Sequence, residues 1–345
     1  MANPFQNMPD IGKKKKITLT PNRNRMPLLF GALGLLLLLL CLAAAGAGWF
    51  LLQNKTIPFT NVPNPIVAPG QAATSPFSSS NSSARIAFSV ERGDRPEDKY
   101  VWLMKSDGSG AQKVIERASS PAFSPDGTQL AYYHWSDGIF VANVDGSNAH
   151  KILGETNAKY LTWSHDGKWI AFASQPIQKD GVNVNIDAIR PDGSDRRTIV
   201  VGGSQPSWSP DDKQIVFSTC RGADCGIFIA SSLGGDAGTK VIWELGSNPA
   251  WSPDGRRIVY QAEADGVKQL YTINPDGTGK KQLTNNTSIH VGAQWSPDGG
   301  AIIYRSTEGG SWGIWRMNAD GANPVKLSND MPAVDWAYER VAVIK

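Results

Sequence analysis

The residues in this 345-residue sequence that could do chemistry are few and scattered. The segment Gly309–Gly313 has the pattern G-x-S-x-G, which in many hydrolases places a nucleophilic serine on a turn between a strand and a helix. Here the pattern separates two short β-rich runs, at a place where other parts of the chain carry Asp-Gly turns. We therefore expect a hairpin loop here and no nucleophile.

The histidines and cysteines offer no local metal site either. The four histidines follow no ligand spacing and are His134, His150, His165 and His290. This spacing does not test whether residues far apart in the sequence form a metal site at the centre of the fold. Cys220 and Cys225 bracket a short loop, and we predict that they form a disulfide. The sequence predicts no cofactor and no catalytic constellation.

An uncharged apolar run over residues 27–52 predicts a membrane helix, because about 20 such residues cross a bilayer. Basic residues lie almost wholly before it, so residues 1–26 are predicted to be a cytoplasmic tail and the remainder extracytoplasmic. We expect a single-pass protein of the plasma (inner) membrane. A cleaved signal peptide is the alternative, but the preceding region is long and Trp49 is suited to the membrane interface. Cys41, within the run, is interpreted as a small apolar residue.

Residues 53–84 are rich in proline and serine, and predict a disordered, partly extended linker. The chain has a net charge of +3, but residues 1–26 alone hold six basic residues and one acidic residue. The remainder is therefore slightly acidic. This composition argues against nucleic-acid binding, which needs a basic surface.

A five-residue phrase recurs through the rest of the chain and marks an internal repeat. Its serines lie at positions 124, 164, 209, 252 and 296, a spacing near 43 residues. The consensus is an aromatic residue followed by Ser-Pro-Asp-Gly, in which proline, aspartate and glycine each favour a tight turn. The aspartates could suggest calcium, but their presence in every copy favours turn chemistry. A second phrase containing Asp-Gly runs in phase with the first.

β-Rich runs flank both phrases, and four short strands fit each period. Four antiparallel strands per repeat of about 43 residues is the pattern of a β-propeller blade. The sequence thus predicts an all-β protein over residues 85–345, a β-propeller of four-stranded antiparallel blades preceded by one transmembrane helix and the linker.

The repeats resemble those of TolB-like β-propellers, which are related to WD-repeat propellers. The resemblance covers about residues 84–345 and implies the fold of that family, without implying that the chain is TolB itself. Two copies depart from the phrase, with His165 in place of proline and Asp212 in place of glycine. We expect each departure to weaken its turn.

The ends of the repeat region predict six blades. Residues 85–115 supply three strands of a blade that lacks an inner strand, and residues 332–336 are predicted to be that strand. Residues 340–344 have no place in this assignment.

Two hypotheses about function follow. The first is a non-catalytic, membrane-tethered module that binds a protein, or a peptide or glycan ligand, on the propeller face formed by the second-to-third and fourth-to-first strand connections. Eight residues are predicted on this partner face by position: His134, Trp135, Tyr160, Gln205, Asn248, His290, Gln294 and Trp312. The alternative is an enzyme, a glycan lyase or a peptide or glycan hydrolase, with its site in the central pocket.

Overall fold

The computed structural model describes residues 84–91, 98–135, 137–155, 158–174, 184–221, 224–328 and 339–345. The predicted tail at 1–26, the predicted anchor at 27–52 and all of the linker except Ala84 lie outside these residues. Among the described residues, no helix is long and apolar enough to cross a membrane.

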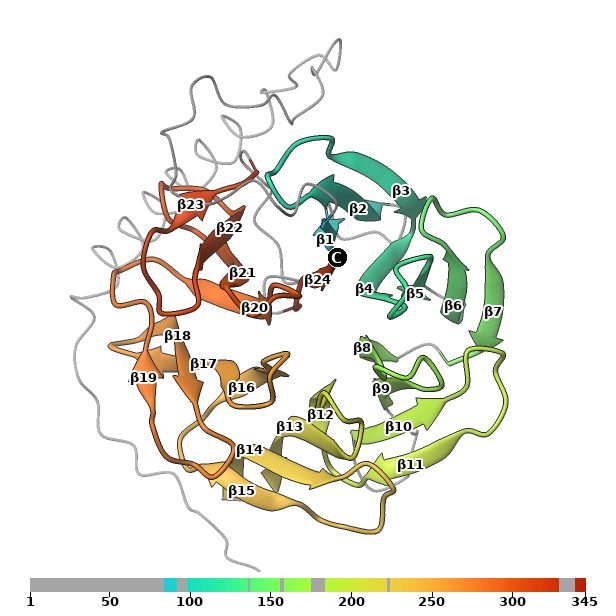
Figure 1. The fold of residues 1–345 in the computed structure, drawn as a ribbon. Coiled ribbons are helices and arrows are strands. Elements are labelled where there is room, and N and C mark those ends of the chain that lie inside the picture. Colours follow the sequence, from blue (N-terminus) through green and yellow to red (C-terminus); the bar gives the residue numbers. More distant parts are fainter. Residues whose placement is uncertain are drawn as a thin grey trace, which may run out of the picture. The chain divides into compact units, whose positions relative to one another are not determined.

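In the described part of the chain, the strands form six four-stranded antiparallel sheets around a common axis (Figure 1). The first blade contains β24 (Ala342–Ile344), β1 (Arg85–Glu91), β2 (Lys99–Lys105) and β3 (Gln112–Glu116). The second contains β4 (Ala118–Phe123), β5 (Gln129–His134), β6 (Gly138–Asn143) and β7 (His150–Leu153). The third contains β8 (Lys159–Trp163), β9 (Ile170–Ser174), β10 (Asn185–Ile189) and β11 (Arg197–Val200).

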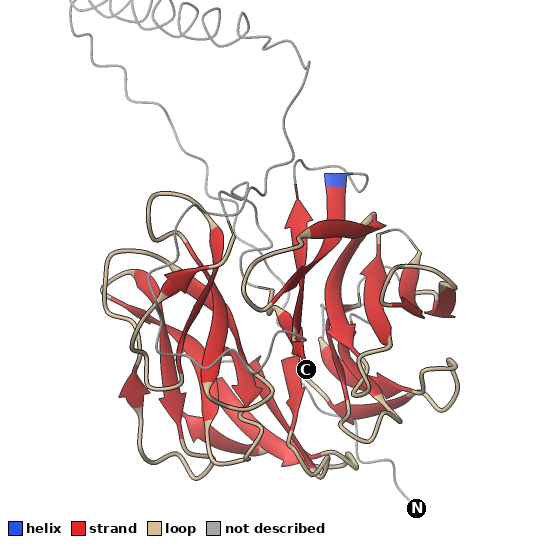
Figure 2. Ribbon diagram, turned by 45° about the horizontal axis from the view of Figure 1, so that its top comes forward, coloured by secondary structure: helices blue, strands red, loops and turns tan. Residues whose placement is uncertain are grey.

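The remaining blades repeat this order. The fourth contains β12 (Ser204–Trp208), β13 (Gln214–Arg221), β14 (Asp224–Ser231) and β15 (Thr239–Ile242). The fifth contains β16 (Ser247–Trp251), β17 (Ile258–Ala264), β18 (Val267–Ile273) and β19 (Lys281–Gln282). The sixth contains β20 (His290–Trp295), β21 (Ala301–Ser306), β22 (Gly313–Asn318) and β23 (Val325–Lys326). The predicted six-bladed propeller is confirmed, and Figure 2 shows it as strands joined by loops at both ends of the ring.

The repeated phrase forms the turn between the first and second strands of five blades. In the second blade, the Ser124 hydroxyl donates to Asp126 Oδ1 at 2.6 Å, and its oxygen accepts the Gln129 N–H at 2.9 Å. The same serine-to-aspartate bond recurs in the other four turns at 2.6–2.7 Å. The hydrogen bond from Ser124 lowers the pKa of the Asp126 carboxyl. The aspartates therefore bond within their own turns, as the sequence indicated.

The hydrophobic core is divided among the six junctions between blades. Each of six clusters of buried side chains combines residues from two neighbouring blades, including the junction of the sixth with the first. Alternate side chains of a strand point to opposite faces of its sheet, so each blade packs against both neighbours. Tryptophans add hydrogen bonds across two junctions, since Trp208 Nε1 donates to the Thr162 carbonyl at 3.2 Å and Trp295 Nε1 to the Ala250 carbonyl at 3.1 Å.

The ring closes through the two ends of the propeller, but with a different strand from the one expected. The prediction that residues 332–336 form the inner strand of the first blade is wrong, because β24 takes that place and pairs with Arg85–Ala87 of β1. The segment that had no place in the sequence assignment is therefore the closing strand. Residues 332–336 themselves lie outside the described residues.

The hydrogen bond from Trp208 to the third blade gives a test of the blade junctions. We expect Trp208→Phe to lower the free energy of unfolding by about 1 kcal/mol, because it removes one buried hydrogen-bond donor and keeps most of the packing of the aromatic side chain. Urea denaturation measures this change. Trp243→Phe is the matched control, since Trp243 is 81% exposed and should unfold like the parent chain. An equal loss in both variants would contradict the assigned role.

Candidate functional site

Three of the predicted partner-face residues occupy one structural position, repeated around the axis of the propeller. Tyr160, Gln205 and Asn248 each lie four residues before the serine of the repeated turn and have left-handed backbone conformations, with φ of 57°, 56° and 56°. Ser120 and Gly292 take the same place in the second and sixth blades, with φ of 52° and 64°. Each sits at a β-bulge in an inner strand, where the pairing with the second strand shifts. We call these five positions the bulge ring.

A bulge frees a backbone N–H from its own sheet, and several of these N–H groups are satisfied by side chains. The Tyr160 N–H donates to Ser120 Oγ at 3.3 Å and the Asn248 N–H to Gln205 Oε1 at 2.8 Å, in each case from one blade to the blade before it. The Gly292 N–H donates to Gln261 Oε1 of the fifth blade at 2.9 Å. Polar side chains at the axis therefore tie neighbouring blades together.

Glu339 belongs to the first blade and precedes its inner strand, which begins at Ala342. Its carboxylate accepts hydrogen bonds from Ser89 Oγ at 2.6 Å, Ser120 Oγ at 2.9 Å and the Ser120 N–H at 3.2 Å. Arg305 of β21 donates through Nε to the Glu339 carbonyl at 3.1 Å and through Nη1 to the Ser89 carbonyl at 3.2 Å. Burial lowers the pKa of Arg305 to about 9, against the opposing effect of Glu339.

His290 packs in the interior. Its side chain is fully buried, with Nε2 2.8 Å from Asn286 Oδ1 and its ring 5.7 Å from that of Tyr304. Desolvation lowers its pKa to about 4, so the ring is neutral at pH 7. Asn248 is similarly buried, with 1% of its surface exposed. As the structure stands, neither side chain can touch a partner.

The other predicted residues lie in separate places, apart from the consecutive pair His134 and Trp135. His134 Nδ1 is 3.1 Å from Asp137 Oδ2, and the half-buried ring of Trp135 lies 4.3 Å from Lys99 Nζ. Gln294 lines the central cavity of the ring, and Trp312 is half-buried in the β21–β22 loop. The structure thus brings Tyr160 and Asn248 to Gln205 and places Gln294 with Tyr160 in the cavity lining, but it does not gather the eight residues into one site.

The G-x-S-x-G segment forms a hairpin loop, as expected. Ser306 pairs with Gly313 across the strands β21 and β22, and Gly309 and Gly310 have positive φ of 81° and 91°. Ser311 Oγ accepts a hydrogen bond from Lys326 Nζ at 3.2 Å. Among the described residues, no group of three or more His, Cys, Asp or Glu side chains could hold a metal ion.

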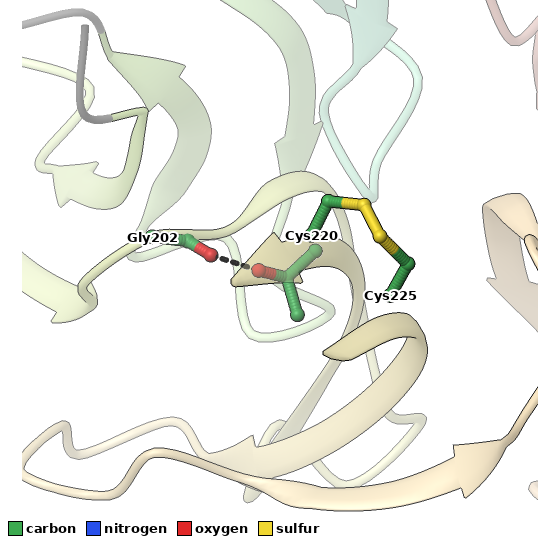
Figure 3. Close-up of a disulfide and its surroundings, with 4 residues drawn as sticks. Gly202, Cys220 and Cys225 are labelled. Atoms are coloured by element: carbon green, nitrogen blue, oxygen red, sulfur yellow. Dashed lines mark hydrogen bonds between the residues drawn. A yellow bond between two sulfur atoms is a disulfide. The ribbon is translucent and has the colours of Figure 1, made fainter. Parts of the chain in front are cut away.

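The structure contains the predicted disulfide. Cys220 and Cys225 are paired residues of the β13–β14 hairpin and are joined through their sulfurs (Figure 3). The Thr219 hydroxyl next to this bridge donates to the Gly202 carbonyl in the connection between the third and fourth blades. The stapled hairpin is thereby fixed to its neighbouring connection.

The two departures from the repeated phrase compensate each other. The Asp212 carboxylate accepts the backbone N–H of His165 at 2.7 Å and that of Asp166 at 2.8 Å, and its Oδ1 lies 3.0 Å from His165 Nδ1. A proline at position 165 would have no N–H to donate, and a glycine at position 212 would have no carboxylate. These residues form an interblade clamp, so the expectation that they only weaken their turns is incomplete.

Exposed apolar side chains on two consecutive fourth-to-first connections were missed by the sequence interpretation. Val201, in the β11–β12 connection, is 67% exposed, and Trp243 and Leu245, in the β15–β16 connection, are 81% and 65% exposed. Antiparallel topology places these connections on the predicted partner face, together with the second-to-third hairpins. No periodic signal marks them, because they lie in connections outside the repeated phrases.

Comparisons with known proteins agree with the fold. A family model described as the TolB beta propeller domain matches residues 206–333, and no curated protein matches the sequence. TolB from Acinetobacter baumannii is 20% identical, with a TM-score of 0.65 over 76% of this chain and 67% of that one. A protein assigned as TolB from Agrobacterium tumefaciens is 19% identical, with a TM-score of 0.57 over 71% of this chain and 89% of that one.

Similarity of fold extends to an enzyme. The tricorn protease is 16% identical, with a TM-score of 0.55 over 72% of this chain and 26% of that one. The propeller of this chain is TolB-like, and its fold is shared by proteins of different activities.

The buried His290 predicts a pH dependence of stability. Its pKa is about 4 in the folded protein against 6.5 for the free side chain, so between these values the unfolded chain binds the extra proton. The contribution of His290 to the free energy of unfolding has its full value above about pH 6.5. It decreases as the pH falls toward 4, by roughly 3 kcal/mol in all. Between pH 7 and pH 4, the free energy of unfolding of His290→Gln should therefore fall by less than that of the parent chain, and the difference should be roughly 3 kcal/mol. Urea denaturation at the two pH values measures it. His150→Gln, at an exposed histidine, should lose as much as the parent chain; equal losses in all three would contradict the prediction.

The interblade clamp predicts coupled effects of its two members. We expect His165→Pro or Asp212→Gly alone to lower the free energy of unfolding by roughly 1–2 kcal/mol, since each leaves the other without its partner. The double variant restores the repeated phrase in both turns and should regain about 1 kcal/mol relative to the sum of the single changes. Urea denaturation of the four proteins measures this coupling, and strictly additive changes would contradict the clamp.

Proposed function

We propose that this chain is a membrane-tethered, extracytoplasmic binding module that holds a protein partner on the partner face of its propeller. The observation that carries the proposal is the exposure of Val201, Trp243 and Leu245 on two consecutive connections of that face. Exposed aromatic and aliphatic side chains gain most when a partner removes them from water, and tryptophan is prominent among the residues that dominate interfaces.

The surroundings of Trp243 favour a protein surface as the partner. Lys240 Nζ lies 4.7 Å from the Trp243 ring centroid, and Glu244 accepts hydrogen bonds from Tyr260 at 2.9 Å and Lys280 at 2.6 Å. The connection is thus held by polar contacts while its apolar side chains remain in solvent. A connection that is already partly ordered loses less conformational entropy on binding than a flexible one does.

The tether and the compartment come from the sequence and from the disulfide. The apolar run at 27–52, with basic residues before it, supports an anchor with the propeller outside the cytoplasm. A bridge between Cys220 and Cys225 supports the same compartment, because disulfides persist mainly in oxidising environments. The linker would let the propeller meet a partner at a distance from the bilayer.

Co-purification with a paired control tests the proposal. The full-length chain is extracted from its native host in mild detergent, beside the double variant Trp243→Ala/Leu245→Ala and the variant Leu233→Ala. Leu233 is the matched control because it is 79% exposed but lies in the β14–β15 turn, on the opposite face. We expect the double variant to recover at least about tenfold less of a stoichiometric partner, and the control to recover the full amount.

Two outcomes would contradict this function: equal recovery of the partner by all three proteins, or equal loss in the double variant and the control. The variants Trp135→Ala and Trp312→Ala then map how far the contact extends across the face.

A further inference from the structure

The axis of the propeller contains a cavity of about 170 Å³ between the inner strands and β24. Its apolar wall is formed by Phe123, Trp163, Trp208 and Trp251. Arg340 is among the polar residues that line it. The cavity therefore combines an aromatic wall with a guanidinium group.

Arg340 has an unusual environment for a cation. It precedes β24 in the first blade and reaches the fourth blade across the axis, where Nη2 donates to the Pro206 carbonyl at 2.9 Å and to the Gln205 carbonyl at 3.4 Å. Its Nε is buried and has no hydrogen-bond acceptor among the described residues. Burial lowers its pKa to about 10, so it remains charged at neutral pH.

The described residues supply no anion for this charge. Glu339 is the nearest carboxylate along the chain, but its oxygens accept hydrogen bonds from Ser89 and Ser120. Within the described ranges, Arg340 donates to the Gln205 and Pro206 carbonyls, and no carboxylate offsets the effect of burial on its pKa. A buried charge without a counter-ion is costly, and carbonyl oxygens compensate for it only in part.

The walls limit the kind of anion that fits. The Arg340 guanidinium, which lines the cavity, suits a single carboxylate, whereas a phosphate dianion would need several further donors. The tryptophans and Phe123 offer an apolar surface to the rest of such a ligand, as in most small-molecule sites. The neighbouring Glu339 carboxylate disfavours a second negative charge.

We propose that the axial cavity binds a small aromatic or aliphatic monocarboxylate, whose carboxylate accepts a hydrogen bond from Arg340 while its apolar body packs against Trp163, Trp208 and Trp251. The lining includes Pro125 and His165, which lie in the repeated turns on the face opposite the partner face. We expect a ligand to enter from that side, past the interblade clamp. This site is separate from the proposed partner surface, so either proposal can fail alone.

Benzoate and benzamide are the probes, because they share one shape and differ in charge. Isothermal titration of the full-length chain in detergent micelles should show saturable benzoate binding on the order of 1 mM and at least about tenfold weaker binding of benzamide. We expect Arg340→Gln to weaken benzoate binding by at least about tenfold. Arg256→Gln, at an exposed turn arginine, is the matched control and should bind like the parent chain.

Three results would overturn the proposal: no saturable benzoate binding in the parent chain, equal binding of benzamide, or full benzoate binding by Arg340→Gln. Should Arg340→Gln fail to fold, Gln294→Trp provides a second variant, because it fills part of the cavity and leaves the arginine in place. Undiminished benzoate binding by Gln294→Trp would place the anion elsewhere and would equally reject the site.

Discussion

The whole propeller depends on closing a ring whose two ends meet in one blade. Only three residues of β24 pair with β1, a short ladder to hold six blades together. The closure gains further contacts above that ladder, where Glu339 binds Ser89 and Ser120 and Arg305 of the sixth blade binds the carbonyls of Glu339 and Ser89. Side chains from the first, second and sixth blades thus converge on the segment that completes the ring. Buried polar groups at this point therefore hold the two ends of the ring together.

Local turn chemistry explains why most of the fold could be predicted from the sequence. Each repeated phrase carries its own hydrogen bonds from serine to aspartate, so the same residues specify the same turn wherever they occur. The closing strand has no such phrase beside it, and three residues give no reliable period. Its identity is decided by the geometry of ring closure, which sets residues far apart in sequence beside each other. The prediction therefore failed at the one blade that is assembled from both ends.

The residues of the candidate site likewise fall into two groups, those that the sequence marks and those that only the folded structure reveals. Tyr160, Gln205 and Asn248 could be found from the sequence because they keep a fixed distance from a recognisable turn, although their shared role as bulge residues could not. Arg305 and Arg340 carry no such mark, since their burial and their carbonyl partners exist only in the closed ring. His165 and Asp212 can be recognised in the sequence as departures from the phrase. Only the structure shows that the Asp212 carboxylate accepts hydrogen bonds from the turn that contains His165 in the neighbouring blade.

The two ends of the propeller axis differ in chemistry, and this difference limits what each can do. On the partner face, apolar side chains stand in solvent on connections that vary in length, a surface suited to a large partner and open to change without damage to the core. At the axis, an arginine and three tryptophans line a cavity of about 170 Å³, which has room for a small molecule. Because Arg340 joins the closing segment to the opposite blade, an anion that binds it would stabilise the closed ring by its own binding free energy. Occupancy of the cavity would then reach the partner face through the same closure on which all six blades depend.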